Sequence, residues 1–596
     1  MGPGPAARYR ARLAEWEADA ARRERRYNQL SVARAVLFVL IIGLAWLGLA
    51  RGTPPLWWAG IPLAGFLLIA LQHERVAVAR DRARRAVSWY RLALDRLDDR
   101  WAGQGVTGES FRDAEHLIAD DLDLFGTGSL FELLCTARTS VGQETLAGWL
   151  KAPAAPELIG PRQHAVKELV DRPDLLEDLA LAGVRVGGPS GRVVLTQWGH
   201  GPPVAVPAWA RPAAFAAGLA NVLALAGAAW FGLPVLAAVA VMAASALLSA
   251  GLRRPVEAIV AAAGRPAPDL DLMATLIARL ERETFVAPLL VSLRGRFTDG
   301  DGTPVSARIA RLHRLGGLLD SRKNQLFLPV AALLLWTTQC ALAIEAWRRQ
   351  SGGAIGRWLE TLGEFEALAA LATFAEEHPG YAWPEVIAGP ALLEATALGH
   401  PLLPRAGTVT NDLGLGPDLR LMVVSGSNMS GKSTMLRAVG VNVVLAQAGA
   451  PVRAGAMRLS ALAVGASFRV VDSLREGQSR FYAEIARLRR IMDLLDGERP
   501  PLFLLDELLS GTNSHDRLIG ARAIVEHLVR RGAIGLITTH DLALAGIADG
   551  LGAPAVNVHF EDHLEAGRLA FDYRLRPGVV QRSNALELMR SVGLDV

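Results

Sequence analysis

The chain has 596 residues, enough for three or four domains, so a single globule is not expected. A hydrophobic fraction of 51% and a mean hydropathy of +0.25 are high for a soluble protein and require a search for membrane segments. The net charge of +4 permits an anionic partner without requiring one. The 2 cysteines, Cys135 and Cys340, belong to no CxxC or Cys/His pattern, so neither a disulfide framework nor a zinc site is indicated and a reducing cytosol fits.

Two pairs of uncharged runs predict two transmembrane helical hairpins. The first pair covers 36–50 and 56–71, separated only by RGTPP, and the second covers 212–231 and 233–252, with a Gly/Pro break between its halves. With flanking residues, each run comes near the roughly 20 residues that cross a bilayer as a helix. Basic residues crowd the outer ends of both pairs, so the positive-inside rule places both termini and the central region in the cytoplasm.

Each pair has an alternative interpretation. The first run could be a cleavable signal peptide, but the segment before it is long and contains several acidic residues, unlike a short n-region. The second pair is rich in alanine and could instead form buried helices of a soluble core.

The remaining chain changes character once. Helical periodicity runs through 105–200 and 255–400. After that, short apolar strands such as LMVV, LFLL and AIGLIT alternate with helical stretches, which is typical of an α/β domain with a mostly parallel sheet. The predicted fold class is therefore multidomain: an α-helical core with two transmembrane hairpins, followed by an α/β phosphate-loop domain.

Residues 426–433, GSNMSGKS, fit the pattern G-x-x-x-x-G-K-[ST] between a strand, LMVVS, and a helix that begins TMLRAVG. In this pattern the glycines let backbone N–H groups wrap phosphates, Lys432 reaches the β- and γ-phosphates, and Ser433 supplies a Mg²⁺ ligand. The predicted nucleotide-binding residues are Gly426, Ser427, Asn428, Met429, Ser430, Gly431, Lys432, Ser433 and Thr434.

Two further strand ends complete a predicted ATP hydrolase. The strand LFLL ends in Asp506, a candidate Mg²⁺ ligand, and Glu507, a candidate general base for the attacking water. His540 follows the strand 533–538, arrives at the same sheet edge and is the second catalytic candidate, placed to sense the γ-phosphate. The predicted cofactors are ATP and Mg²⁺.

A fifth apolar run covers 326–344, LFLPVAALLLWTTQCALAI. If it crossed a membrane, the number of crossings would be odd, and the phosphate loop would face outward, where ATP is scarce. We therefore expect a buried core helix, although a membrane segment remains the alternative.

The segments GSNMSGKSTMLRAVG, VVDSLREGQSRFYAEIARL, LFLLDELLSGTNSHDR and ITTHDLALA occur in this order and resemble the ATPase domain of the MutS family, an ABC-type ATPase. Residues 390–596 match that family well and 110–190 match moderately. The resemblance implies a homodimer with composite sites, in which Gly477 and Ser479 of EGQS contact the γ-phosphate bound by the other subunit. It also implies that the loop Ser510–Ser514 lines the nucleotide and the dimer interface.

The chain also departs from that family. Where mismatch-correcting members carry an N-terminal domain with a DNA-wedging F-x-E motif, this chain has Arg-rich sequence and a membrane hairpin. The triplet Phe374-Ala375-Glu376 spells the motif but falls in a predicted core helix, so we interpret it as a coincidence. The basic segment 308–323 could contact DNA phosphates, or could be a solvated or lipid-facing surface.

The expected domains are a cytoplasmic Arg-rich helix (1–32), hairpin 1 (33–72), the first part of a MutS-like helical core (73–205), hairpin 2 (206–254), the second part of the core with the lever (255–400) and the ATPase domain (401–596). The predicted protein is a multi-pass inner-membrane ATPase with its ATPase domain in the cytoplasm. Its predicted partners are lipid, a second copy, and mismatched, branched or irregular DNA bound by structure in DNA repair. The alternative is an ATPase of a membrane process without DNA. The four apolar runs contain few polar residues and so offer no path for a substrate, which argues against a transporter.

Overall fold

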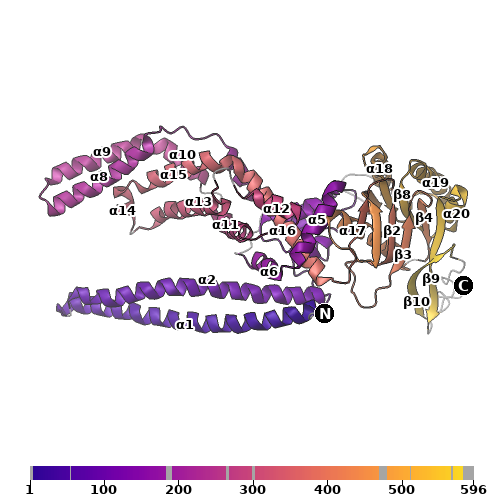
Figure 1. Ribbon diagram of the computed structural model, residues 1–596, viewed down its shortest axis with the longest axis horizontal. Coiled ribbons are helices and arrows are strands. Elements are labelled where there is room, and N and C mark those ends of the chain that lie inside the picture. Colours follow the sequence, from indigo (N-terminus) through magenta and orange to yellow (C-terminus); the bar gives the residue numbers. More distant parts are fainter. Residues whose placement is uncertain are drawn as a thin grey trace. The chain divides into compact units, whose positions relative to one another are not determined.

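The computed structural model describes residues 4–53, 55–182, 191–263, 267–298, 302–325, 327–427, 429–468, 480–510, 512–565 and 568–580. These residues form two compact units: one consists of 1–105 with 180–183, and the other of 106–179 with 184–596. Figure 1 shows the chain coloured along the sequence, with its helices and strands labelled.

Helices fill the chain up to residue 377. The α-helices of this part are α1 Pro5–Arg51, α2 Gly60–Leu97, α3 Leu130–Leu134, α4 Ser140–Lys151, α5 Pro156–Val170, α6 Pro173–Leu181, α7 Gly191–His200, α8 Ala210–Trp230, α9 Val235–Gly251, α10 Arg253–Ala263, α11 Ala267–Glu281, α12 Pro288–Gly295, α13 Val305–Asp320, α14 Leu328–Leu333, α15 Trp336–Ser351 and α16 Ile355–Glu377. Short 3₁₀ helices are η1 Leu56–Ala59, η2 Glu109–Phe111, η3 Ser321–Lys323 and η4 Gly352–Ala354.

Strands and helices then alternate. The strands are β1 Glu385–Ile387, β2 Leu393–Leu398, β3 Asn411–Leu415, β4 Leu421–Ser425, β5 Ala456–Ser460, β6 Ala463–Ser467, β7 Pro501–Leu505, β8 Ile534–Thr539, β9 Ala555–Glu565 and β10 Arg568–Pro577. The helices are α17 Lys432–Ala448, α18 Arg480–Asp493, η5 Leu494–Asp496, α19 Ser514–Arg530 and α20 Leu542–Leu551. This order matches the predicted change from a helical region to an α/β domain.

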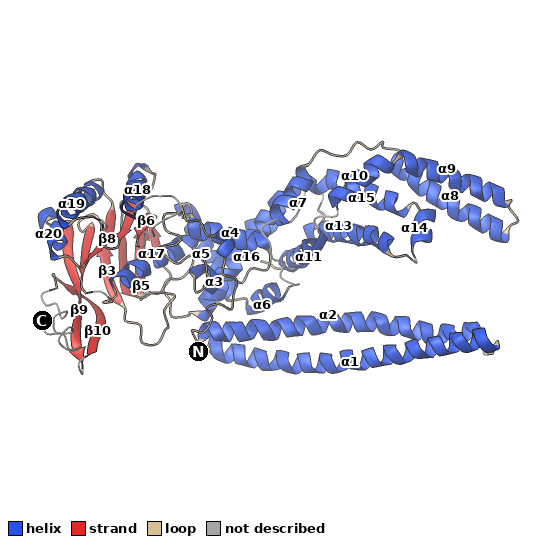
Figure 2. Ribbon diagram, turned by 180° about the vertical axis from the view of Figure 1, so that it is seen from behind, coloured by secondary structure: helices blue, strands red, loops and turns tan. Residues whose placement is uncertain are grey.

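The first unit is a hairpin of α1 and α2, two long helices that lie side by side (Figure 2). The expected helix 1–32 and the first apolar run belong to one uninterrupted α1, which ends at Gly52 in a left-handed conformation with φ 67°. The polar halves of the two helices are joined by Arg84–Glu24 at 2.8 Å and Arg91–Glu17 at 2.7 Å. The basic N-terminal segment is therefore a partner of α2 within a coiled pair.

Three helices of the described chain are long and apolar enough to cross a membrane: Pro5–Arg51, Trp57–Leu97 and Ala210–Trp230. A fourth span arises if Val235–Gly251 and Arg253–Ala262, bent by 58°, count as one. The apolar window of the first helix has no buried residue, and only 22% of the window in the third is buried. The four predicted runs are thus helical and largely uncovered by protein, while their placement in a bilayer remains a prediction.

The fifth apolar run differs from the single core helix expected over 326–344. It is divided into α14 and α15 by Leu335, which adopts a left-handed conformation with φ 48°. The second half is buried as expected, including Cys340 to Ile344, but α14 buries only Ala331. The physical reason for the break lies in side-chain hydrogen bonds from α8 and α15, described below.

Helix α16 is the centre of the helical region, and nearly all of its side chains are buried. It packs against α4, α5 and α7. The carboxylate of Glu366 on α16 accepts hydrogen bonds from the backbone N–H groups of Arg138 (2.6 Å) and Thr139 (3.1 Å), just before α4 begins. Phe374 and Glu376 are both buried in α16, which agrees with the interpretation of the F-x-E triplet as core sequence.

The α/β region contains two sheets. A four-stranded sheet has the order β1-β5-β2-β3, and a six-stranded sheet has the order β10-β9-β4-β8-β7-β6. In the larger sheet β6, β7, β8, β4 and β9 are parallel neighbours, whereas β10 pairs antiparallel with β9. Because the carboxyl ends of parallel strands lie at one edge, Ser425, Leu505 and Thr539 end side by side there.

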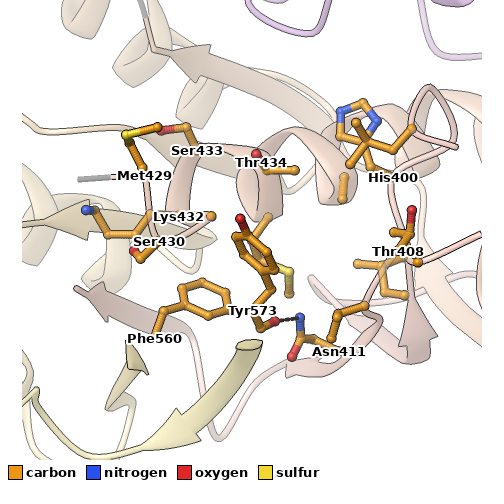
Figure 3. A pocket seen from close by; sticks show the side chains of 18 of the residues that line it. His400, Thr408, Asn411, Met429, Ser430, Lys432, Ser433, Thr434, Phe560 and Tyr573 are labelled. Atoms are coloured by element: carbon orange, nitrogen blue, oxygen red, sulfur yellow. Dashed lines mark hydrogen bonds between the residues drawn. The ribbon is translucent and has the colours of Figure 1, made fainter. Parts of the chain in front are cut away.

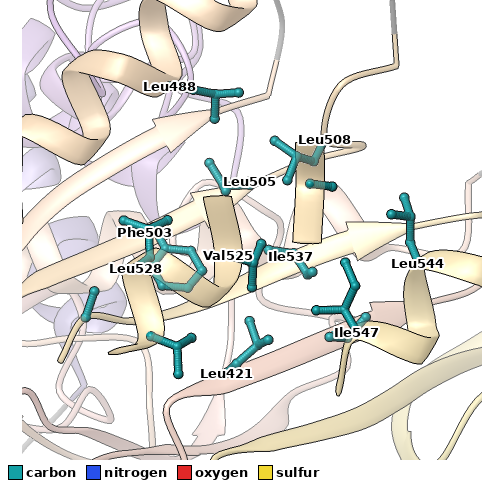
Figure 4. Packing of buried hydrophobic residues seen from close by; sticks show 14 of the residues in the cluster. Leu421, Leu488, Phe503, Leu505, Leu508, Val525, Leu528, Ile537, Leu544 and Ile547 are labelled. Carbon is teal, nitrogen blue, oxygen red and sulfur yellow. The ribbon is translucent and has the colours of Figure 1, made fainter. Parts of the chain in front are cut away.

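The residues of the larger sheet alternate between its two faces. Phe503 and Leu505 pack with Val525 and Leu528 of α19 and with Ile547 of α20 in one hydrophobic cluster (Figure 4). The opposite face is covered by α17, where a Cβ on Gly440 would lie 3.0 Å from Leu504. This packing fixes the strand ends against α17, at whose N-terminus the phosphate loop lies.

Candidate nucleotide-binding site

The predicted phosphate loop connects β4 to α17, as the sequence pattern requires. Gly426 (φ 151°) and Gly431 (φ 100°) have positive φ values, which glycine adopts without steric cost. A Cβ on Gly426 would lie 2.9 Å from Ser430 Oγ, and one on Gly431 would lie 3.1 Å from Tyr573 Cδ1. Met429 also has a positive φ (71°) and is 86% exposed, so this part of the loop faces outward.

The side chain of Lys432 lies under the loop. Its Nζ donates hydrogen bonds to the carbonyl oxygens of Gly426 and Ser427, both at 2.7 Å. Burial lowers the pKa of Lys432 because it removes water from the ammonium, and the nearby carboxylates of Glu507 and Asp506 oppose this effect. The lysine thus holds the loop curved and places a cation among its backbone groups.

Two loop hydroxyls also support an anion site. In the described part of the chain, Ser427 Oγ and Ser430 Oγ are buried without a hydrogen-bond partner. Buried hydroxyls normally have partners, so these two atoms fit a bound group rich in acceptor oxygens. The N-terminus of α17 adds its dipole at the same point. The chemistry of the loop therefore fits a phosphate chain.

The carboxylates predicted at the end of β7 are held by β8. Thr538 Oγ1 donates a hydrogen bond to Asp506 Oδ1 and accepts one from the backbone N–H of Glu507 at 3.0 Å. Glu507 has a positive φ of 51°, which turns its side chain out of the strand direction. Its Oε1 lies 3.3 Å from Nδ1 of His540, and both side chains are partly exposed. The structure thus brings the two predicted catalytic residues into contact.

A pocket of about 640 Å³ extends from the phosphate loop. Seven of the predicted residues line this one cavity: Met429, Ser430, Gly431, Lys432, Ser433, Thr434 and Glu507. Asp506 is hydrogen-bonded within the adjoining strand end. Among the described residues, no three His, Cys, Asp or Glu side chains gather as metal ligands. This does not conflict with the Mg²⁺ prediction, because Mg²⁺ sites of this type use a hydroxyl, one carboxylate and phosphate oxygens.

Part of the wall of the pocket was not predicted from the sequence (Figure 3). It includes His400, Thr408, Asn411, Phe560 and Tyr573, which come from two segments about 160 residues apart. Asn411 joins these segments, because its Nδ2 donates to the Tyr573 carbonyl (3.0 Å) and its Oδ1 accepts from the Leu575 N–H (2.7 Å). The rings of Phe560 and Tyr573 give the pocket flat apolar surfaces suited to a nucleobase.

The position of Tyr573 depends on an irregularity in β10. The pairing of β10 with β9 shifts register between Phe571 and Leu575, and Tyr573 has a positive φ of 54°. Tyr573 lies within the range 390–596 that resembles the family, but no local signal in the sequence marks it as a pocket residue. A bulge can re-aim a side chain in this way.

Arg453 and Asn442 fix the loop 399–404 of the pocket by hydrogen bonds to its carbonyl oxygens. Arg453 Nη1 donates to the carbonyl oxygens of His400 (2.8 Å) and Leu403 (2.7 Å), and Asn442 Nδ2 donates to that of Gly399 (2.9 Å). Burial lowers the pKa of His400 to about 4, and the charges of Arg437 and Arg453 act in the same direction. This imidazole is therefore neutral at pH 7.

Some predicted residues lie outside the described residues: Asn428 of the phosphate loop, Gly477 and Ser479 of the expected trans contact, and Gly511. In the loop 510–514, Asn513 caps α19 by accepting a hydrogen bond from the Asp516 N–H at 3.0 Å. Its expected role at a dimer interface remains a prediction.

The basic segment 308–323 forms α13 and η3. Arg308 is half-buried, with Nη1 donating to Ser351 Oγ at 3.2 Å, whereas Arg311 and Arg314 are exposed. Both interpretations of this segment, DNA contact and a solvated or lipid-facing surface, stay open.

Comparison with known proteins agrees with the predicted family for the C-terminal part. Residues 422–595 match the family model of MutS domain V. The chain is 37% identical over 236 residues to DNA mismatch repair protein MutS 2 of Halobacterium salinarum, which covers 38% of this chain and 26% of that protein. It is 36% identical over 249 residues to DNA mismatch repair protein MutS of Myxococcus xanthus (39% and 27%) and 34% identical over 201 residues to Endonuclease MutS2 of Thermomicrobium roseum (33% and 25%).

The chain thus spans about a quarter of the length of these curated relatives. The matches support membership of the MutS family, and the family model places that evidence in the α/β region. The predicted order, a helical region followed by an α/β region, is confirmed, and residues 422–595 of the α/β region are similar to MutS domain V.

Proposed function

We propose that the chain is a membrane-anchored ATPase of the MutS type that acts on DNA in repair and changes conformation as it hydrolyses ATP. The observation that carries this proposal is the shared pocket, in which Lys432, Ser433 and Glu507 face one cavity of nucleotide size. The name DNA mismatch repair protein, borne by two of the relatives, supports the DNA part.

ATP binding follows from the loop chemistry. The backbone N–H groups of the loop 426–434 and the ammonium of Lys432 would hold the phosphates. Phe560 and Tyr573 would hold the base against their rings. Ser433 and Asp506 would hold Mg²⁺, which neutralises the negative charge that the phosphates carry.

Hydrolysis follows from the pair at the strand ends. Glu507 accepts a proton from the attacking water as the water oxygen bonds to the γ-phosphorus and the bond to the β,γ-bridging oxygen breaks, which yields ADP and inorganic phosphate. His540, in contact with Glu507, orients the carboxylate. Thr538 holds the backbone of the same turn and thereby the direction of the Glu507 side chain.

Dimerisation, DNA binding and membrane anchoring belong to the same proposal. The family resemblance implies a homodimer in which Gly477 and Ser479 complete the partner's site. The helices with the composition of membrane spans support anchoring, with the ATPase domain in the cytoplasm, where ATP is available. The second candidate, an ATPase of a membrane process without DNA, is favoured by the same apolar helices.

The test combines turnover and binding on the detergent-solubilised protein. We would measure ATP hydrolysis and DNA affinity with homoduplex, mismatched and branched DNA at two salt concentrations, with Glu507→Gln as the control that binds but does not turn over. Selective binding of mismatched or branched DNA that changes the turnover rate is the expected result. Turnover that responds to lipid or protein but not to DNA would favour the second candidate. A wild-type rate equal to that of Glu507→Gln would contradict the ATPase proposal.

A further inference from the structure

The break between α14 and α15 lies in an uncharged run. Leu335 has a left-handed conformation, which a leucine adopts only where its surroundings impose it. Neither glycine nor proline stands at the break itself, since Pro329 lies at the start of α14. The cause must therefore be sought in the contacts that the broken helix makes.

Polar side chains bind the carbonyl groups that the break releases. Asn221 Nδ2 on α8 donates to the Leu333 carbonyl at 2.9 Å, and Gln339 Nε2 donates to the Leu334 carbonyl at 2.7 Å. Asn221 is in turn fixed by Ser245 of α9, whose Oγ donates to Asn221 Oδ1 at 2.9 Å. Both Asn221 and Ser245 are buried. Hydrogen bonds thus connect the break to α8 directly and to α9 through Asn221.

The backbones of α8 and α14 approach closely at this point. A Cβ on Gly218 of α8 would lie 3.0 Å from the Leu334 carbonyl oxygen, so only glycine permits this distance without a shift. A cavity of about 600 Å³ adjoins the break and is lined partly by the hydroxyl residues Ser245, Ser249, Thr337 and Thr338. Irregular backbone is tolerated at membrane depth only where it is paired with neighbouring helices or lines such a cavity.

The outer side of α14 is apolar and exposed. Leu328 is 54% exposed and Val330 is 43% exposed. Leu223 on α8 and Leu236 on α9 are likewise exposed, to 61% and 79%. Soluble proteins rarely expose an apolar surface of this extent. The Nε1 of Trp336 donates to the Leu318 carbonyl at 2.6 Å, which ties the start of α15 back to the end of α13.

We propose that α14 and the break at Leu335 form a re-entrant segment, which enters the lipid bilayer beside α8 and α9 and returns to the side from which it came. This inference rests on the proposed membrane anchoring. The occupant of the α14 surface is the hydrocarbon of the bilayer, because α14 packs beside α8, a helix of membrane-spanning composition, and both helices expose apolar side chains. A re-entrant segment also keeps the ATPase region and the helical core on one side, which a fifth crossing would not do.

The test measures whether a spin label at position 330 is exposed to lipid or to water. Cys135 and Cys340 are buried, so both are replaced by alanine, and the ATPase rate checks the background. Single cysteines at Val330, at Leu236 and at Val286, which is 84% exposed in a loop of the helical region, then carry a nitroxide spin label. The protein is reconstituted in vesicles of phosphatidylethanolamine and phosphatidylglycerol, and collisions with oxygen and with a water-soluble nickel chelate are compared.

We expect labels at Val330 and Leu236 to favour oxygen and to be protected from nickel, and the label at Val286 to meet nickel freely. If Val330 behaves as Val286 does while Leu236 is in lipid, the re-entrant segment is refuted and the anchoring stands. Nickel contact at Leu236 would instead contradict the anchoring itself. Protection of Val330 from both reagents would mean that protein, such as a second copy, covers α14, and this too overturns the proposal.

A second measurement separates re-entry from crossing. Cysteines replacing Asn324 and Arg349, which lie on either side of the segment and are exposed, are treated with a membrane-impermeant maleimide in sealed vesicles of one orientation. A re-entrant segment gives reaction at both positions from the same side as Val286. Reaction from opposite sides would show a full crossing and would overturn the proposal.

Discussion

The sheet edge and the second hairpin place polar groups by different means. At the sheet edge, where three parallel strands end together, Lys432 and Glu507 line one pocket and His540 contacts Glu507, and each residue stands in a recognisable local pattern. In the hairpin region, Asn221 and Gln339 donate hydrogen bonds to the backbone of a broken helix, and no sequence motif marks either residue. A site at the ends of parallel strands can therefore be predicted from sequence motifs. A site made by contacts between packed helices cannot, because no motif marks the residues involved.

The largest effect is expected at the sheet edge. Glu507→Gln removes the general base and keeps the shape, so we expect ATP turnover to fall by about 10³-fold while nucleotide binding is retained. Steady-state turnover and binding of a fluorescent ATP analogue measure the two quantities. A variant that kept more than about a tenth of wild-type turnover would show that another group takes the proton and that Glu507 is not the general base.

The next prediction concerns His400 in the pocket wall, where burial sets the pKa of the imidazole. The pKa of His400 is lowered to about 4 from an ordinary value of 6.5. The unfolded chain therefore binds a proton that the folded protein does not, so this contribution to stability is complete above pH 6.5 and is lost as the pH falls towards 4. The loss amounts to about 3 kcal/mol by pH of about 4.

The matched variant is His400→Asn, which keeps an acceptor near Nδ1, the atom that receives the Leu402 N–H at 3.2 Å. Urea unfolding at several pH values gives the free energy of unfolding for both proteins. Wild type should lose more stability than the variant on acidification. Equal pH dependence in the two proteins would place His400 in contact with water.

In the hairpin region, Asn221→Leu deletes the amide that binds the Leu333 carbonyl and leaves Ser245 without its acceptor. We expect a loss of about 2 kcal/mol, since a buried polar group without a partner costs this much. Thermal unfolding in detergent measures the loss, and Leu223→Ala on the outer face of the same helix is the control, expected to change little. If both variants unfolded alike, the hydrogen bond at the break would be of no consequence.

The sequence predicted the order of elements, the phosphate loop and the pair Glu507–His540, because glycine spacing and strand ends are local features. It did not predict Tyr573 or Asn411, since the bulge in β10 and the approach of β3 are set by pairing between distant segments. It also assigned one helix to 326–344, because hydropathy does not reveal that Asn221 can bind a released carbonyl.

The smallest expected effect lies between these two kinds of site. Thr538 belongs to a buried strand and showed no functional signal, yet its hydroxyl joins Asp506 to the Glu507 N–H. Thr538→Val keeps the shape and removes the hydroxyl, so the Glu507 backbone loses its acceptor and the carboxylate loses its fixed direction. We expect kcat to fall about tenfold, equivalent to about 1.4 kcal/mol, with little change in KM, because the threonine orients the base and does not line the nucleotide pocket.

Thr538→Ser restores the hydroxyl and should recover most of the rate, which a merely structural role of the methyl group would not allow. A rise in KM with unchanged kcat would instead place Thr538 in nucleotide binding. Recovery by serine would mean that the pairing of β7 with β8, rather than the motif at the end of β7 alone, sets the direction of the catalytic carboxylate. The geometry of the catalytic site would then depend on contacts between distant segments, as the geometry of the broken helix does. The motif would predict the chemistry of the site but not the direction of its carboxylate.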